Sequence, residues 1–157
     1  MKLKVFIIAV AIVFVSCGSD AKKGNETSKP NEEKVEVNDV VVSDDSMQDI
    51  GIGPIESMTL SEIDEAMAAE GEVVFKAKCS ACHKLSKRFV GPGLAGVTER
   101  RSPEWIMNMI LNPEEMVEKN PTAKKLLAEY LAPMANQNLT ETEARQILEY
   151  FRTKKAK

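Results

Sequence analysis

The chain has 157 residues, with 21 Lys or Arg, 24 Asp or Glu and a formal net charge of −3. This length suits one domain with additional segments, and the charge is not that of the strongly basic chains that bind nucleic acids. Aromatic residues are scarce, and no long run of β-branched residues follows residue 58, which disfavours a β-sheet domain.

The first sixteen residues have the pattern of a processing signal. Two Lys precede an entirely apolar run at 5–15, which is too short for a typical membrane span and fits the apolar region of a signal peptide. The run ends in Phe14-Val15-Ser16-Cys17, which resembles a bacterial lipoprotein cleavage box with Phe14 where Leu is usual. The resemblance implies removal of residues 1–16 and lipidation of Cys17. An uncleaved anchor, or an ordinary secretory signal with an incidental Cys, is the alternative.

Residues 17–57 are predicted to form a flexible acidic tether. They are rich in Lys, Glu, Asp, Asn, Ser and Gly, and acidic residues outnumber basic ones. Little apolar surface is available to offset the entropy lost on ordering. Partial alternation at 35–40 is compatible with a strand, but a solvated coil is the preferred interpretation. Such a tether would let a lipid-anchored domain leave the membrane surface and meet a partner.

Residues 58–157 are predicted to form an all-α domain that opens with a helix. A capping-box pattern at 59–62 marks its expected start, and Gly71 is expected to interrupt or bend it. The apolar face of this helix is assigned to Ile63, Ala66, Met67, Val73, Val74 and Ala77.

The helix leads into Cys79-Ser80-Ala81-Cys82-His83, which has the spacing that attaches a c-type haem. The thiols of Cys79 and Cys82 can form thioether bonds to the haem, and His83 can then reach the iron. A redox disulfide or half of a zinc site would use the same Cys pair. With one His in the chain and Cys17 far away, a zinc site would need a carboxylate, and no βαβ pattern of a thioredoxin-like fold is visible.

The segment after the motif contains three Gly and one Pro at 91–96, which indicates irregular backbone that can lie close to a flat group. In the haem interpretation, the carbonyl of Pro92 accepts a hydrogen bond from the second ring nitrogen of His83. This bond would fix the tautomer and raise the basicity of the ligand, while Leu94 would pack on the porphyrin face. A surface loop is the alternative.

Three further helices are expected. The second begins at Ser102-Pro103 and ends at 112–113, the third begins at 120–121, and the fourth has a capping box at 140–143. Their apolar sides are assigned to Trp105, Ile106, Met109 and Ile110, to Ala123, Leu126, Leu127 and Tyr130, and to Ala144, Ile147, Leu148 and Phe151. So small a core would be marginal alone, and the haem would become much of it.

From about residue 71 to 155 the chain resembles a bacterial class I, monohaem cytochrome c domain. The resemblance rests on the motif at 79–83, on 91–94, and on Pro133-Met134 shortly before a terminal helix. It implies a small helical domain wrapped around one covalent haem c, with Met134 as the sixth iron ligand. Members of the family often have Pro after this Met, whereas here Pro133 precedes Met134.

The solitary His excludes a second imidazole within the chain, so the far side of the iron is left to Met, Lys or Asn, or to nothing. Met107 and Met109 fall in a predicted helix, where Met usually packs in the core. Met116 falls in a stretch predicted as a loop and is the main alternative to Met134 as the sixth iron ligand. Met/His ligation raises the reduction potential and fills the iron's coordination, which favours a one-electron carrier rather than an enzyme. A haem-based sensor or gas-binding domain with a labile sixth ligand is the alternative.

Basic residues dominate the sequence around the motif, where Glu99 is the only acid between residues 76 and 101. They form either an ordinary solvated face or a collar that steers an acidic redox partner. A terminal oxidase or a periplasmic reductase is the expected partner class, and residues 105–113 resemble cytochromes associated with nitrous oxide reduction. The protein is expected on the periplasmic side of the cell envelope, anchored to a membrane by lipid and not bound to nucleic acid. The basic residues are Lys76, Lys78, Lys84, Lys87, Arg88, Arg100 and Arg101.

Overall fold

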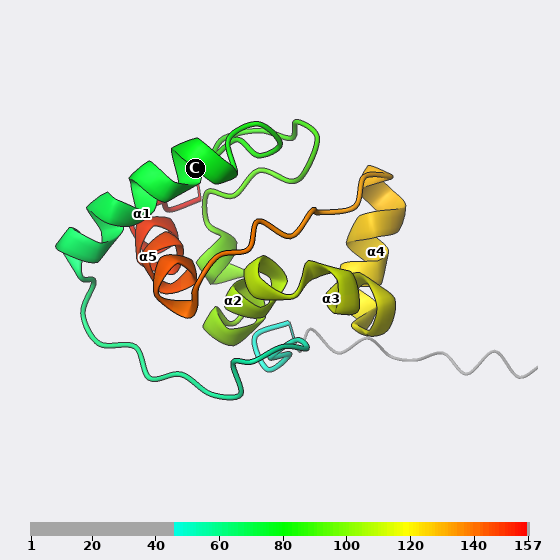
Figure 1. Cartoon of the computed structure of the whole chain (residues 1–157), viewed down its shortest axis with the longest axis horizontal. Coiled ribbons are helices and arrows are strands. Elements are labelled where there is room, and N and C mark those ends of the chain that lie inside the picture. The colour runs from blue at the N-terminus through cyan, green and yellow to red at the C-terminus, as the bar shows by residue number, and fades with distance from the viewer. Residues whose placement is uncertain (1–45, 157) are drawn as a thin grey trace, which may run out of the picture. The chain divides into compact units, whose positions relative to one another are not determined.

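The computed structural model describes residues 46–156, which form five α-helices and one short 3-10 helix without a strand (Figure 1). In chain order these are α1 (Glu65–Lys78), η1 (Val97–Glu99), α2 (Pro103–Leu111), α3 (Pro113–Lys119), α4 (Pro121–Tyr130) and α5 (Glu141–Arg152). The predicted all-α class is confirmed. The predicted signal peptide, the lipidation site Cys17 and the tether up to residue 45 lie outside the described residues. Within the described part, no helix combines the length and hydropathy that a membrane span requires.

Helices α1 and α5 pack tightly along one another, as Figure 1 shows. Gly71 is buried at this contact, and a Cβ atom there would overlap the backbone carbonyl of Gln146. Phe75 packs against the rings of Tyr150 and Phe151, with centroids 5.5 and 5.7 Å away. The expectation that Gly71 interrupts α1 is therefore wrong: the helix is continuous, and the missing side chain lets α5 approach.

The start of α1 also differs from the sequence-based prediction. The helix begins at Glu65 with Asp64 as its N-cap, six residues after the predicted start at 59. The carbonyl of Ser61 accepts a hydrogen bond from Arg152 at 2.6 Å, and the Asp64 amide donates to the buried carboxylate of Glu149 at 3.3 Å. These bonds to α5 engage the backbone just before α1, and the local capping pattern at 59–62 does not start the helix.

The other predicted helix starts are confirmed by their caps. The Ser102 hydroxyl accepts from the Trp105 amide at 3.1 Å and begins α2, and the Asn120 side chain caps α4. Thr140 and Glu143 form the complete capping box of α5. Helix α3 was not predicted from the sequence, where the Asn-Pro pair at 112–113 indicated only the end of α2.

Residues 46–58, which we call the strap, lie against α2, α3 and the start of α4. The Asp49 carboxylate accepts two hydrogen bonds from the Asn120 side-chain amide, at 2.9 and 3.0 Å. Asn108 bonds to the backbone of Ile55 in both directions, at 2.9 Å each. The tether was predicted to continue to residue 57, and this boundary is wrong, because polar side chains fix its last residues to the folded unit.

Candidate functional site

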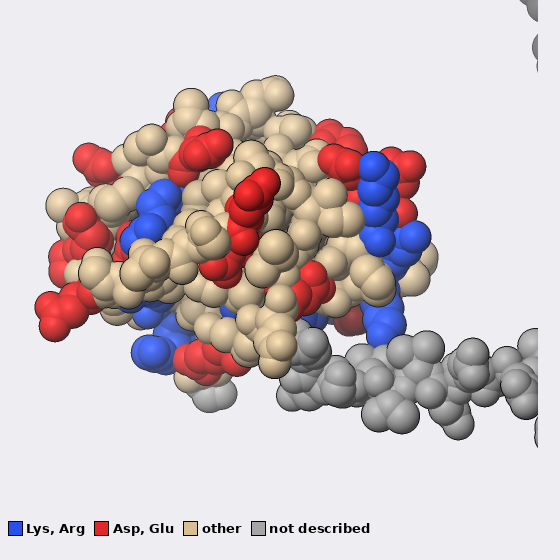
Figure 2. All heavy atoms as spheres, turned by 90° about the horizontal axis from the view of Figure 1, so that it is seen from below, with Lys and Arg blue, Asp and Glu red and all other residues tan. Residues whose placement is uncertain are grey.

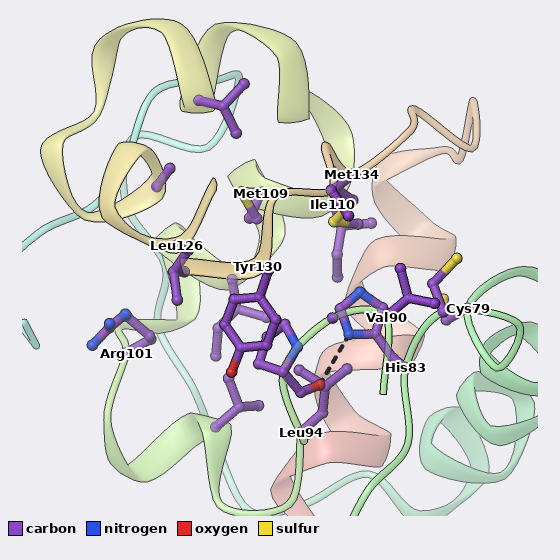
Figure 3. A pocket seen from close by; sticks show the side chains of 18 of the residues that line it. Cys79, His83, Val90, Leu94, Arg101, Met109, Ile110, Leu126, Tyr130 and Met134 are labelled. Carbon is purple, nitrogen blue, oxygen red and sulfur yellow. Dashed lines mark hydrogen bonds between the residues drawn. The ribbon is translucent and has the colours of Figure 1, made fainter. Parts of the chain in front are cut away.

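A cavity of about 240 Å³ lies between the loop that follows α1 and helices α2, α4 and α5 (Figure 3). Its walls are mainly apolar and include Trp105, Ile110, Leu126 and Phe151. The structure brings all six predicted cofactor-binding residues to this cavity: Cys79, Cys82, His83, Pro92, Leu94 and Met134.

The Cys pair and the His continue the end of α1. The Cys79 amide donates to the carbonyl of Phe75 at 2.9 Å, and the His83 amide donates to the carbonyl of Cys79 at 2.9 Å. Burial raises the pKa of the Cys79 thiol to about 11, and proximity to Cys82 adds to the effect. Cys79 is therefore protonated at neutral pH, unlike the low-pKa thiolate of a redox-active Cys pair. Both thiols are free of disulfide bonds.

The imidazole of His83 is oriented by the loop that follows it. Nδ1 of His83 lies 3.1 Å from the carbonyl oxygen of Pro92, so Nδ1 carries the proton and donates it (dashed line in Figure 3). The other ring nitrogen, Nε2, is then an acceptor with a lone pair available to a metal. The Gly91 amide donates to the carbonyl of Cys82 at 2.9 Å, which folds the loop back onto the motif. A Cβ atom on Gly91 would overlap the His83 ring, so Gly91 has a role at the site that the sequence did not reveal.

Two methionines, Met134 and Met109, line the cavity, and both are labelled in Figure 3. Met134 lies in the extended segment between α4 and α5, and Met109 lies on α2. Met116 is not a cavity residue: it is fully buried in α3, where its Sδ accepts a hydrogen bond from the Ile52 amide of the strap at 3.0 Å. The prediction that Met116 lies in a loop is wrong, and its sulfur already has a partner.

Arg88 joins the loop after the motif to the C-terminal end of α4. It belongs to the loop between His83 and Pro92, and its guanidinium donates to the backbone carbonyl and the carboxylate of Glu129 at 2.9 and 3.2 Å. The same guanidinium lies 4.1 Å from the ring centroid of Tyr130, which lines the cavity four residues before Met134. One side chain therefore connects the loop that follows His83 with the end of α4, from which the segment of Met134 continues.

One edge of the cavity is cationic. Arg100 and Arg101 both line it, and neither forms an ion pair with a carboxylate among the described residues. Partial desolvation and then the neighbouring Arg101 charge lower the pKa of Arg100. An anionic group in the cavity would offset this repulsion.

The described part of the chain has no ligand set for the alternative of a zinc site. No three His, Cys, Asp or Glu side chains within residues 46–156 are grouped so that they could hold a metal ion. The groups that meet at the cavity are two thiols, one imidazole, two thioethers and apolar walls, and this set suits a covalently attached haem.

Comparisons with known proteins point in the same direction. The family model described as cytochrome c matches residues 68–155. Among solved structures, the chain is similar to a cytochrome c from Rhodothermus marinus, with 44% identity and a TM-score of 0.64 over 70% of this chain and 94% of that one. Among curated proteins, it is similar to a cytochrome c-553-like protein of Synechocystis sp., with 33% identity over 69 residues, which are 41% of this chain and 66% of the relative. A cytochrome c2 of Rhodopseudomonas palustris is 54% identical over 35 residues, which are 22% of this chain and 30% of the relative. The chain therefore spans less than two thirds of these curated relatives.

Proposed function

The chain belongs to the cytochrome c family and carries one covalently attached c-type haem, and from this premise we propose that it is a membrane-tethered one-electron carrier with His83 and Met134 as iron ligands. The observation that carries the proposal is the convergence of six residues on one cavity, in which the Pro92 carbonyl holds the proton of His83 Nδ1. The haem, when bound, supplies a one-electron couple, and the protein residues position it and exclude water.

The chain's residues have separate tasks in holding the haem. Cys79 and Cys82 are the thioether attachment points, and His83 presents Nε2 to the iron because Nδ1 is engaged by Pro92. This hydrogen bond would increase the basicity of the imidazole and so favour the oxidised iron when the haem is bound. The side chains that would hold the haem carboxylates are the cationic and phenolic groups at the cavity: Lys78, Arg100, Arg101 and Tyr130.

Met134 is the proposed sixth ligand because it lines the cavity from a segment without helical hydrogen bonds, where its side chain can be adjusted to the iron. Met116 is a poorer candidate because its sulfur is buried in α3 and accepts a hydrogen bond from the strap. A thioether ligand raises the reduction potential. It also fills the coordination position that a substrate would need, so the proposed reaction is electron transfer without chemistry on a bound substrate.

The proposed partner is a periplasmic or membrane redox enzyme with an acidic docking surface. Basic residues of the loop after the motif, such as Lys84, Lys87 and Arg88, lie on the same segment as the haem attachment site. The face seen in Figure 2 has a different character, since acidic and basic side chains are interspersed on it. Steering by the basic loop would accelerate encounter at low salt and lose effect as the Debye length falls to about 8 Å at 0.15 M.

The proposed location is the periplasmic side of the cell envelope, with a lipid anchor at Cys17. The support is the apolar run at 5–15 followed by the lipoprotein-like sequence that ends at Cys17. Each buried methylene of an acyl chain contributes about 0.8 kcal/mol, so several chains hold a protein on a membrane durably. Mass spectrometry of the mature N-terminus tests this part separately, because an unmodified Cys17 would contradict it.

Spectroscopy combined with a redox titration of the mature protein tests the proposed function. We expect haem that remains bound after denaturation, a reversible one-electron couple, and the red-end absorption band of a methionine–ferric bond. Haem that is lost on denaturation would contradict covalent attachment. A couple without the methionine band, together with rapid binding of carbon monoxide or nitric oxide, would favour the sensor alternative.

A further inference from the structure

The segment that carries Met134 has few bonds to the rest of the protein. It connects α4 with α5, and Figure 1 shows it passing α3 and α2. In the described part of the chain, the backbone at 132–139 forms no backbone–backbone hydrogen bond with another element. Met134 and Leu139 pack partly against the core. Backbone without such hydrogen bonds opens locally at a low free energy, so a ligand on this segment depends on support from side chains.

Asn136 supplies the side-chain bonds that tie this segment to another element. Its amide group donates to the carbonyl of Leu111 at 3.3 Å and to the carboxylate of Glu114 at 3.4 Å. Leu111 is the last residue of α2, and Glu114 lies in the first turn of α3. We call residues 111–115 the α2–α3 corner. The other hydrogen bonds that the structure describes at 132–139 stay within that segment.

The oxygen of the Asn136 side chain gives the segment its local shape. It accepts a hydrogen bond from the Asn138 amide at 2.8 Å, and Asn138 has a left-handed backbone with φ 52°. Asparagine tolerates this conformation, and the bond closes an Asx turn. A flipped amide would place its oxygen against the Leu111 carbonyl and the Glu114 carboxylate, which are both acceptors. The three bonds together therefore fix the orientation of the Asn136 side chain.

Asn136 stands beside the cavity without lining it. Met134 and Gln137 are cavity residues, whereas Asn136 between them is not. Met134 and Asn136 are half-buried, and Ala135 between them is exposed, so the extended backbone turns both side chains toward the protein. Because its amide group is bonded to the α2–α3 corner, Asn136 acts on Met134 through the backbone of the segment, two residues away.

The α2–α3 corner is also bonded to the strap. Asn112 donates to the carbonyl of Ile52 in the strap at 3.4 Å and to the carboxylate of Glu115 at 2.7 Å. One turn earlier on α2, Asn108 bonds to the backbone of Ile55 in the strap. The corner is thus restrained by bonds on both sides of the helix junction, and a side chain that binds it holds its own segment in place.

We propose that Asn136 is a positioning residue for the proposed iron ligand Met134, because it fixes the segment of Met134 to the α2–α3 corner. The proposal rests on the proposed function and names the group that holds the sixth ligand at the iron. Without the bonds of Asn136, the segment would open more often, and Met134 would be away from the iron for a larger fraction of the time. An external ligand gains apparent affinity in proportion to that fraction.

Binding of imidazole to the ferric, haem-loaded full-length protein measures this fraction, because imidazole takes the position that Met134 leaves. For Asn136→Ala we expect an increase of about tenfold in imidazole affinity and a weaker red-end absorption band. Glu114→Ala removes one of the two acceptors and retains the bond to Leu111, so we expect an increase of about threefold. The double variant should match Asn136→Ala alone, since Glu114 acts through Asn136.

Two control variants separate positioning from stability. Asn138→Gly accepts the left-handed backbone and retains both bonds of Asn136 to the α2–α3 corner, so its imidazole affinity should equal that of the parent. Gly71→Ala perturbs the contact of α1 with α5, and Gly71 does not line the cavity. At a temperature where this variant is folded, its imidazole affinity should also be unchanged.

The outcomes distinguish the positioning role from the ligand assignment. If the methionine band depends on Met134, but Asn136→Ala and Glu114→Ala bind imidazole as the parent does, the positioning role is overturned and the ligation stands. An equal increase with Gly71→Ala also overturns the positioning role. A band that survives Met134→Ala overturns the ligand assignment and the role of Asn136 with it. Glu114 is exposed, so its variant provides the test even if Asn136→Ala does not fold.

Discussion

Gly91 leaves room for the imidazole of His83, because a Cβ atom at residue 91 would overlap the ring. The backbone amide of Gly91 also donates a hydrogen bond to the carbonyl of Cys82 in the motif. The position of His83, the proposed iron ligand, thus depends on the absence of a side chain at residue 91. The next residue, Pro92, supplies the carbonyl that accepts the hydrogen bond from His83 Nδ1.

Gly91→Ala is expected to disturb the proposed ligand directly. The overlap would force either His83 or the loop to move, at a cost of about 1–3 kcal/mol in the free energy of unfolding. We expect an altered haem absorption spectrum and a lower urea midpoint. Gly93→Ala is the control, because its Cβ would lie 3.1 Å from the backbone of Lys87 and not against the imidazole. It should reduce stability without the spectral change, and an unchanged Gly91→Ala spectrum would contradict the role of Gly91.

Substitution of the methionines should separate ligation from packing. Met134→Ala should abolish the red-end absorption band and lower the reduction potential, because the thioether ligand is lost. Met116→Leu should keep both and cost about 1–3 kcal/mol of stability, since it conserves volume in the core but leaves the Ile52 amide without its acceptor. Met109→Leu is the critical control, because Met109 also lines the cavity. If the band disappears with Met109→Leu and survives Met134→Ala, the ligand assignment is wrong.

Arg88→Ala is expected to loosen the connection between the two ligand segments. The ion pair to Glu129 and the contact with Tyr130 are exposed, so each contributes about 0.5–1 kcal/mol. We expect a similar total loss in stability and a severalfold increase in the affinity of the ferric protein for added imidazole, which would compete with the proposed ligand Met134. Glu129→Gln retains the Tyr130 contact and the backbone carbonyl, so its effect should be smaller. Equal effects of both variants would show that neither the Tyr130 contact nor the bond to the Glu129 carbonyl contributes.

Gly71→Ala reverses the usual effect of this substitution in a helix. Replacing Gly by Ala inside a helix normally stabilises it by about 0.5–1 kcal/mol. Here the added methyl would overlap the carbonyl of Gln146 on α5, so we expect a loss of about 1–3 kcal/mol in urea unfolding. Ala69→Gly on the exposed side of α1 is the matched reference and should cost about 1 kcal/mol. A stabilising Gly71→Ala would contradict the close contact of α1 and α5.

Asp49→Ala tests whether the strap belongs to the folded unit. Its carboxylate accepts hydrogen bonds from Asn120 and from the Thr122 hydroxyl at 3.2 Å. Hydrogen bonds to charged groups contribute about 1.5–3 kcal/mol, so we expect a loss of that size in urea unfolding. Glu62→Ala, at an exposed carboxylate before α1, should change stability by less than about 0.5 kcal/mol. Equal stability of the two variants would show that Asp49 does not stabilise the folded unit and belongs with the tether.

The features that were predictable from the sequence depend on local chemistry. Ser102 with Pro103, and Thr140 with Glu143, cap their helices through contacts within three residues, so the pattern contains the whole cause. The proximity of Pro92 to His83 likewise arises within one short loop. The family resemblance added Met134, which lines the cavity but has no local signature.

The features that were missed depend on contacts between distant segments. The pattern at 59–62 satisfies a capping box, but bonds from α5 engage Ser61 and Asp64 instead. The strap has no helical or strand periodicity, and it is fixed by hydrogen bonds from Asn108 and Asn120, which lie more than fifty residues later in the chain.

The strap also determines where a pull on the chain would act. Tension from the N-terminal side enters the folded unit at the strap, and the hydrogen bonds of Asp49 and Asn108 would bear it first. Helix α1, which leads to Cys79, follows only after the strap and the extended segment at 59–63. If the chain is held by the proposed lipid anchor, a pull on the domain would break the hydrogen bonds of the strap before any force reached the haem attachment site.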